Sequence, residues 1–107
     1  MNWDGQLHLI GIYKIENSIT GEVYIGQSRD IHERWRHHRR NAFAKDKVRK
    51  YALYRDMRRY GMDKFSFAVI EECSQFKLDE RENYWIEFYN NRVHLYNMKM
   101  PQGVVKR

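Results

Sequence analysis

The chain of 107 residues contains one cysteine, Cys73, and one proline, Pro101. A lone cysteine cannot form an internal disulfide, so the fold needs no oxidising compartment. No apolar run approaches the ~18 residues of a membrane span, and the first ten residues lack the basic and long apolar regions of a secretory signal. These absences favour a cytoplasmic protein, and the length favours one domain with one core.

Acidic residues are scarce in one part of the chain and frequent in another. Residues 29–59 contain twelve Lys or Arg and four acids, whereas residues 71–90 contain six acids and two bases. The net charge is +6, and a hydrophobic fraction of 42% argues against disorder. The basic block favours a polyphosphate partner, although a solvated helical face would give the same composition.

Two similar aromatic triplets, Gly11-Ile12-Tyr13 and Tyr24-Ile25-Gly26, lie on either side of a polar turn. Residues 8–16 alternate as a strand does, and "EVYIGQ" gives a second short strand after the turn cluster "NSITG". A loop of residues 17–20 would place Tyr13 directly opposite Tyr24, with both side chains on one face of the hairpin. A one-residue slip in register would separate the two tyrosines.

The rest of the chain predicts four further elements around one core. In "DIHE", Asp30 and Glu33 form a capping box at the start of a helix. The predicted elements are a helix to about residue 42, a helix over 48–60 ended by Gly61, a strand over 64–72 and a helix over about 76–90. The order β-β-α-α-β-α predicts an α/β sandwich, with a three-stranded sheet flanked by helices.

Three polar side chains fall on apolar helical faces. Arg34 and His38 share a face with Ile31 and Trp35, and Glu82 interrupts the apolar stripe of the last helix. Glutamate is rarely buried unless it is paired or binds a metal, so Glu82 is either a ligand or a rim residue paired with an arginine. His38 is either functional or an ordinary half-buried imidazole, and the neighbouring histidine at position 37 competes for any role.

The tyrosines, Arg34, His38 and Glu82 are expected to converge on the same side of the sheet. Phosphodiester hydrolysis needs an activated water, a cation against the developing oxyanion and help for the leaving alkoxide. One carboxylate can hold a hard divalent ion, and the guanidinium fork suits phosphate oxygens. Tyrosine is a poor base at its reference pKa of ~10, so Tyr13 would need positive charge nearby.

Gly11-Ile12-Tyr13 and Tyr24-Ile25-Gly26 resemble the signature of the GIY-YIG nuclease family. The later matches occur in the same order: "DIHERWRHH", then "ERENYWI", then "YN". The resemblance extends from about residue 10 to 98 and is strongest to the catalytic domain of phage intron-encoded homing endonucleases. It implies a three-stranded antiparallel sheet flanked by helices and an endonuclease that cuts DNA, most simply duplex DNA, with one divalent metal, Mg²⁺ or Mn²⁺.

The resemblance also implies a role for each site residue. Tyr13 becomes the base or water-positioning group, and Tyr24 supports the nucleophile or the scissile phosphate. Arg34 stabilises the transition state, and His38 assists proton handling. Glu82 is the metal ligand. The implied catalytic set is Tyr13, Tyr24, Arg34, His38, Glu82 and Asn97.

Asn97 is the least secure member of this set, because the homing group often has Gly-Tyr-Asn where this chain reads Leu95-Tyr96-Asn97. It is expected to orient its neighbours. The expected DNA contacts are Arg29, Arg36, Arg39, Arg40, Lys45, Lys47, Arg49 and Lys50.

The expected organisation is a single nuclease domain over 1–107, with a core of about 8–98 and a polar tail or linker over 99–107. One site cuts one strand, so a double-strand break needs a homodimer on DNA or two successive events. No separate DNA-binding domain is evident, which leaves an excised catalytic domain or a stand-alone nuclease in the cytoplasm of a phage or bacterial host cell. The alternatives are a non-catalytic nucleic-acid-binding module that uses residues 29–59, and an interaction domain of a larger assembly.

Overall fold

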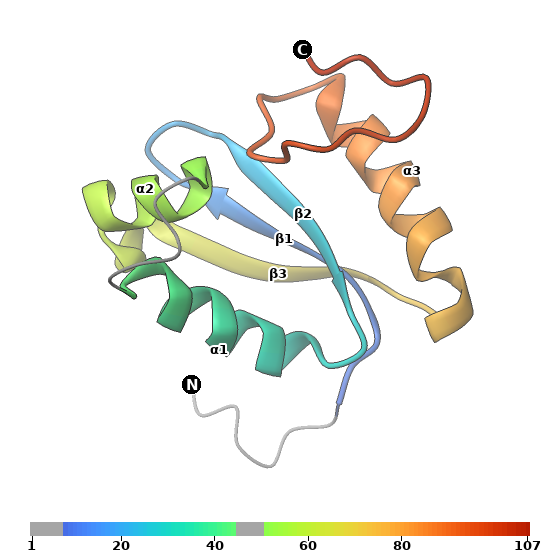
Figure 1. The fold of residues 1–107 in the computed structure, drawn as a ribbon, viewed down its shortest axis with the longest axis horizontal. Helices are drawn as coiled ribbons and strands as arrows, with labels where there is room; N and C mark the ends of the chain where they lie inside the picture. The colour runs from blue at the N-terminus through green and yellow to red at the C-terminus, as the bar shows by residue number, and fades with distance from the viewer. Residues whose placement is uncertain (1–7, 45–50) are drawn as a thin grey trace.

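The computed structural model describes residues 8–44 and 51–107. Its strands form one antiparallel sheet in the order β2-β1-β3, with helices on both faces (Figure 1). The predicted fold class and element order are confirmed. The elements are β1 (Gly11–Asn17), β2 (Val23–Ser28), α1 (Ile31–Ala42), α2 (Ala52–Tyr60), β3 (Phe65–Glu72) and α3 (Leu78–Asn90), with short 3-10 turns at Met62–Lys64 and Gln75–Lys77.

The alternation of side chains along β1 divides the core into two clusters. Tyr13 and Ile15 face α1 and α2, in a cluster that contains Trp35, Leu53 and Met57. Ile12, at the intervening β1 position, faces α3. It belongs to a second cluster of buried side chains: Ile12, Val23, Ile25, Leu78, Ile86 and Leu95. Strand residues with period two therefore bury both faces of the sheet. Figure 1 shows α3 separated by the sheet from α1 and α2.

The hairpin register differs from the predicted one by two residues. Tyr13 lies opposite Gly26, and Ile15 lies opposite Tyr24, so the direct pairing of the two tyrosines is wrong. The reason is the longer loop, residues 18–22, which the Asn17 side chain stabilises by accepting hydrogen bonds from the Ile19 and Thr20 amides. A shift of two keeps every side chain on its face, so the tyrosine rings remain neighbours, with centroids 6.4 Å apart.

The glycines of the two triplets make room for close contacts. A Cβ on Gly26 would lie 2.4 Å from the hydroxyl oxygen of Tyr13. A Cβ on Gly11 would lie 2.0 Å from the Glu71 carbonyl oxygen, next to the irregular pairing of β1 with β3. Glycine is therefore required at both positions by space, and Gly26 in particular allows the Tyr13 ring to lie across β2.

The helix boundaries follow the expected signals with one correction. Asp30 caps α1, since its side chain accepts a hydrogen bond from the Glu33 amide as the capping box predicts. Gly61 ends α2 with a φ of 95°, a conformation that favours glycine. Tyr51 is extended, so α2 begins at Ala52 and not at residue 48, and positions 48–50 lie outside the described residues.

The outer edge of β2 is covered by the segment that follows α3. The Val23 amide donates to the His94 carbonyl, the Tyr96 amide donates to the Val23 carbonyl, and Val23 and Leu95 form a parallel bridge. An exposed sheet edge carries unpaired backbone groups, and this segment satisfies those at the start of β2. Within the described ranges, none of the helices has the length and apolar character needed to cross a bilayer.

Candidate active site

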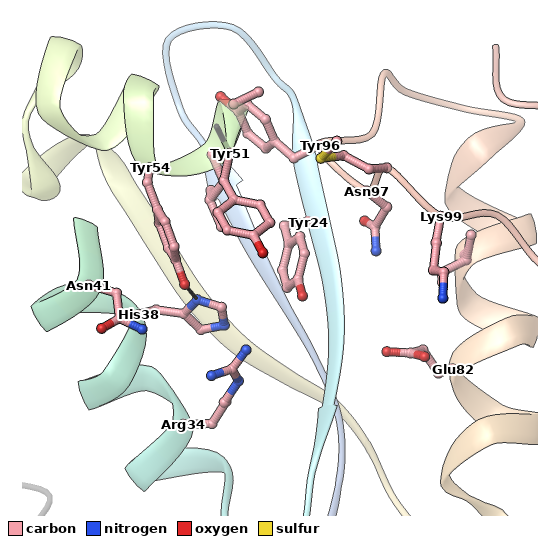
Figure 2. Close-up of a pocket in the computed structure, with 14 residues that line it drawn as sticks. Tyr24, Arg34, His38, Asn41, Tyr51, Tyr54, Glu82, Tyr96, Asn97 and Lys99 are labelled. Atoms are coloured by element: carbon pink, nitrogen blue, oxygen red, sulfur yellow. Dashed lines mark hydrogen bonds between the residues drawn. The ribbon is translucent and has the colours of Figure 1, made fainter. Parts of the chain in front are cut away.

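A cavity of about 530 Å³ lies against β2. Its lining comes from elements on both sides of the sheet: α1 and α2 supply Arg34, His38 and Tyr54, and α3 supplies Glu82. Tyr24 projects from β2 between these two groups (Figure 2). The cavity therefore gathers the side chains of widely separated segments around one edge strand.

The expectation that all site residues lie on one side of the sheet is wrong for Glu82. The helix that carries it packs on the second core cluster, on the face opposite Tyr13. Glu82 still lines the cavity, because α3 passes beside the edge strand β2 and the side chain reaches the site around that edge. Arg34 and Glu82 are thus brought to one cavity from opposite layers.

A buried chain of polar contacts connects β1, α1 and α2. The Tyr13 hydroxyl lies 2.7 Å from Nε2 of His38, and the Tyr54 hydroxyl lies 2.7 Å from Nδ1 of the same ring. Tyr13 is fully buried and is not among the residues that line the cavity, whereas His38 and Tyr54 are. Both imidazole nitrogens are therefore occupied by tyrosine hydroxyls.

The surroundings of His38 keep its ring neutral. Burial lowers the pKa of His38 to about 3, and the positive charges of Arg34 and His37 act in the same direction. Burial also raises the pKa of Tyr13 above its ordinary value of 10.0, with the Arg34 guanidinium as an opposing influence. At neutral pH the cluster holds a neutral imidazole and a neutral phenol.

Tyr24 and Glu82 face the cavity with raised pKa values. Burial raises the pKa of Tyr24, and the charge of Arg34 offsets part of this effect. For Glu82, burial is again the largest cause of the raised pKa, with a lowering contribution from the Gln27 hydrogen bond and a raising one from the Asp79 carboxylate. The side-chain nitrogen of Gln27, Nε2, donates hydrogen bonds to both carboxylates, at 3.2 Å to Glu82 and 2.7 Å to Asp79.

Asn97 replaces a strand partner along the edge of β2. Its side-chain oxygen accepts a hydrogen bond of 2.9 Å from the Ile25 amide, and its side-chain nitrogen donates one of 2.8 Å to the Ile25 carbonyl. A carboxamide that makes both bonds acts like the next peptide unit of a β-ladder. Asn97 thereby fixes the backbone between Tyr24 and Gly26, and it also lines the cavity.

The described residues among the expected DNA contacts lie outside this cavity. Arg29 is exposed just before α1, Arg39 and Arg40 are exposed in the last turn of α1, and Arg36 forms an ion pair of 3.2 Å with Glu33. The Arg39 guanidinium lies 5.2 Å from the centre of the Phe67 ring. The other expected contacts, Lys45, Lys47, Arg49 and Lys50, lie outside the described residues.

The carboxylate of Glu82 suits a hard, partly hydrated cation. Among residues 8–44 and 51–107, no group of three or more His, Cys, Asp or Glu side chains could hold a metal. A closed tetrahedral centre is therefore not formed by these residues. One half-buried carboxylate beside a cavity fits an ion such as Mg²⁺, which keeps several waters and takes its remaining ligands from a phosphate.

Several site residues were not predicted from the sequence. Tyr54, Asn41, Gln27 and Lys99 either line the cavity or hold a residue that does. Tyr54 reaches His38 through the packing of α2 against α1, and Lys99 follows a segment that pairs with β2. The usable signal was the pair of tyrosines at positions 51 and 54, at the start of α2.

Fold and site together define a catalytic domain: one guanidinium, one carboxylate and a tyrosine hydroxyl face a common cavity at the edge of a three-stranded α/β sandwich. The chain belongs to the GIY-YIG family, since the profile described as "GIY-YIG catalytic domain" matches residues 9–97. It is similar to the catalytic domains of homing endonucleases.

Two curated relatives are endonucleases. The chain is 32% identical over 90 residues to Intron-associated endonuclease 1 of Enterobacteria phage T4. This match covers 82% of this chain and 36% of the relative. It is 31% identical over 96 residues to Probable intron-encoded endonuclease 1 of Neurospora crassa, covering 83% of this chain and 30% of the relative. The chain thus spans about a third of the length of these relatives.

Solved structures give the same result. The catalytic domain of homing endonuclease I-TevI matches with a TM-score of 0.69 and 28% identity, covering 84% of this chain and 98% of that domain. A glutamate-to-alanine mutant of the catalytic domain of intron endonuclease I-TevI matches with a TM-score of 0.71 and 26% identity, covering 88% of this chain and 97% of that domain. Nucleases of this family generally depend on a metal ion, and nuclease homologues act on DNA.

Proposed function

We propose that this chain hydrolyses phosphodiester bonds of duplex DNA as a metal-dependent endonuclease, one strand per active site. The observation that supports the proposal is the joint presence of Arg34 and Glu82 at one cavity, in a domain of the GIY-YIG family. Glu82 would hold one divalent ion, Mg²⁺ or, as a substitute, Mn²⁺. When bound, such an ion neutralises charge on the phosphate and polarises its P–O bonds.

Arg34 stabilises the charge that develops on the phosphate. Its guanidinium projects from α1 towards the cavity, where two parallel N–H groups can donate to phosphate oxygens (Figure 2). Arg34 is itself half-buried, so less water surrounds its guanidinium and the interaction is stronger than it would be in bulk solvent. Arg34→Ala should therefore lower the turnover number far more than the affinity for DNA.

The tyrosines act as neutral hydroxyls in this proposal. Tyr24 lines the cavity, and its hydroxyl oxygen can accept a hydrogen bond from the attacking water. Of the two roles implied for Tyr13, its complete burial and its contact with His38 favour positioning over proton abstraction. His38 orients the tyrosine hydroxyls, and Asn97 orients the strand that carries Tyr24.

DNA would approach over the basic side of α1. Arg39 and Arg40 are exposed there, and the expected contacts of the following basic segment lie outside the described residues. Replacing these two arginines with glutamine should weaken binding and reduce the slope of log K against log salt by roughly two, because each released phosphate contact contributes about 0.9. We further propose a single nuclease domain over 1–107, whose partner is a second copy on DNA or a fused DNA-binding domain outside this chain, and which cuts both strands as a homodimer or in two successive events.

Cleavage of supercoiled plasmid tests the proposal directly. The purified chain is incubated with plasmid in Mg²⁺, in Mn²⁺ or in EDTA, beside Glu82→Gln. Nicking or linearisation that requires both the metal and Glu82 is the expected result. Glu82→Gln should retain DNA binding, because the change removes the carboxylate and no basic contact.

Asp79→Asn is the matched control for Glu82→Gln. Asp79 lies one turn earlier on α3 and accepts from the same Gln27 amide, but it is exposed and does not line the cavity. The Asp79→Asn variant should therefore cleave plasmid at the rate of the unchanged chain. Equal activity of Glu82→Gln and Asp79→Asn would refute the metal site, and DNA binding without any cleavage would favour the alternative of a non-catalytic nucleic-acid-binding module.

A further inference from the structure

His38 has both ring nitrogens engaged by hydroxyl groups. Nε2 faces the Tyr13 hydroxyl at 2.7 Å, and Nδ1 faces the Tyr54 hydroxyl at 2.7 Å. The imidazole itself is 1% exposed. A neutral imidazole donates at one nitrogen and accepts at the other, so one of the two tyrosines must donate to the ring and the other must accept from it.

The acceptors within reach of the two tyrosine hydroxyls decide between these arrangements. Tyr13 is 0% exposed, and its charged neighbour Arg34 can only donate hydrogen bonds. In the part of the chain that the structure describes, the imidazole is the acceptor that faces the Tyr13 hydroxyl. If Nε2 carried the proton, the hydroxyl hydrogen of Tyr13 would be buried without an acceptor, which is costly.

Tyr54 does not have this restriction. Tyr54 is also buried, at 6% exposed, but it lines the cavity, and the side chain of Asn41, another lining residue, is within hydrogen-bonding reach of its hydroxyl (Figure 2). Water in the cavity or the Asn41 carboxamide can therefore accept the Tyr54 hydrogen. The favoured arrangement has Tyr13 donating to Nε2, Nδ1–H donating to the Tyr54 oxygen, and the Tyr54 hydroxyl donating into the cavity.

We propose that Tyr54 is a positioning residue of the active site: its oxygen holds the proton of His38 on Nδ1, and the imidazole in turn directs the Tyr13 hydroxyl. The Tyr13 oxygen then keeps its lone pairs for Arg34, so the guanidinium has a fixed partner on the side away from the substrate. The effect of Tyr54 on the reaction is transmitted through His38 and Tyr13. This inference rests on the proposed nuclease function.

The chain offers a closely matched control for Tyr54. Tyr51 also lines the cavity, and its ring contacts the Tyr54 ring edge-on at a centroid distance of 5.6 Å. Its hydroxyl does not take part in the contacts of His38, whose two nitrogens are already occupied. Tyr54→Phe and Tyr51→Phe each remove one hydroxyl group from the lining of the same cavity, and each keeps its ring.

The test combines imidazole ¹⁵N NMR with plasmid cleavage. In the unchanged chain the shifts of His38, assigned with His38→Gln, should show a protonated Nδ1 and an unprotonated Nε2. In Tyr54→Phe the Nδ1 proton loses its acceptor, so each tautomer leaves one donor unpaired and the preference for Nδ1 should weaken, with a measurable population of the Nε2-protonated ring. The turnover number should fall roughly tenfold with KM within about twofold, and Tyr51→Phe should leave both readouts unchanged.

The outcomes separate this inference from the proposed function. A proton on Nε2 in the unchanged chain, or an unaltered His38 spectrum in Tyr54→Phe, would overturn the inference even if cleavage is robust. A shifted proton with an undiminished turnover number would overturn the role in the reaction alone. Absence of cleavage by the unchanged chain would instead refute the proposed function and, with it, the reaction that Tyr54 serves.

Discussion

His38 should make the stability of this domain fall as the solution becomes acidic. Its ring is buried at the junction of β1, α1 and α2, and both nitrogens contact tyrosine hydroxyls. Burial, followed by the charges of Arg34 and His37, lowers the pKa of His38 from 6.5 to about 3. Protonation of the folded state would place a cation beside the Arg34 guanidinium and remove the acceptor nitrogen.

The sign follows from the number of bound protons. Between pH 3 and 6.5 the unfolded chain binds a proton at His38 and the folded chain does not, so the free energy of unfolding rises with pH. The contribution is complete above pH 6.5 and is lost as the pH falls towards 3. Each pKa unit is worth about 1.36 kcal/mol of unfolding free energy. The unfolding free energy should therefore fall by about 2 kcal/mol between pH 7 and pH 5, and by about 5 kcal/mol once the pH is below both pKa values.

Urea unfolding at pH 7, 6 and 5 measures this loss. The unchanged chain is compared with His38→Gln, which keeps hydrogen-bonding groups but cannot titrate in this range. The pH-dependent loss between pH 7 and 5 should be about 2 kcal/mol smaller in His38→Gln. His94→Gln is the control, since His94 is exposed and does not line the cavity. Parallel pH profiles for the unchanged chain and His38→Gln would refute a neutral, buried imidazole.

Three further substitutions test the packing around the site by urea unfolding. Gly26→Ala places a Cβ 2.4 Å from the Tyr13 hydroxyl oxygen and should cost about 2 kcal/mol through overpacking; stability equal to the unchanged chain would contradict this close approach. Asn97→Ala leaves the amide and carbonyl of Ile25 without partners and should cost about 2 to 4 kcal/mol, whereas a loss below about 0.5 kcal/mol would mean that water replaces the carboxamide. Asp56→Ala removes the carboxylate that accepts a hydrogen bond from the buried Tyr96 hydroxyl and should cost about 2 kcal/mol. An unchanged urea midpoint would count against this contact.

The sequence was sufficient for the elements whose signals are local. The capping box at Asp30 and Glu33 predicts the start of α1, and Gly61 predicts the end of α2. The alternation over residues 64–72 predicts β3, whose first residue is Phe65. These signals act within a few residues of the backbone that they shape, so the rest of the fold does not have to be known.

The hairpin register required information that the pattern does not contain. Loops of four and five residues both suit "NSITG", and both keep the two tyrosines on one face because they differ by two residues in register. The choice is made by Asn17, whose side chain accepts from the Ile19 and Thr20 amides and ends β1 one residue later than predicted.

The candidate site was predictable as a set of residues and not as an arrangement. Arg34, His38 and Glu82 were identified because polar groups on apolar faces need a partner or a function. Their spatial relation depends on how helices pack on the sheet, and this is why Glu82 was placed on the wrong face. Tyr54 was missed as a partner of His38 because α2 must first pack against α1 for the two side chains to meet.

The edge position of β2 explains how opposite faces of the sheet can serve one cavity. A central strand separates its two faces completely, whereas an edge strand allows side chains from both layers to meet beside it. In this chain the segment after α3 covers the start of that edge, and Asn97 completes the backbone hydrogen bonds at Ile25. Gln27, two residues further along β2, then holds the Glu82 carboxylate at the cavity. The edge strand therefore fixes the position of Tyr24 from one side and of Glu82 from the other, so damage to its edge contacts should displace both.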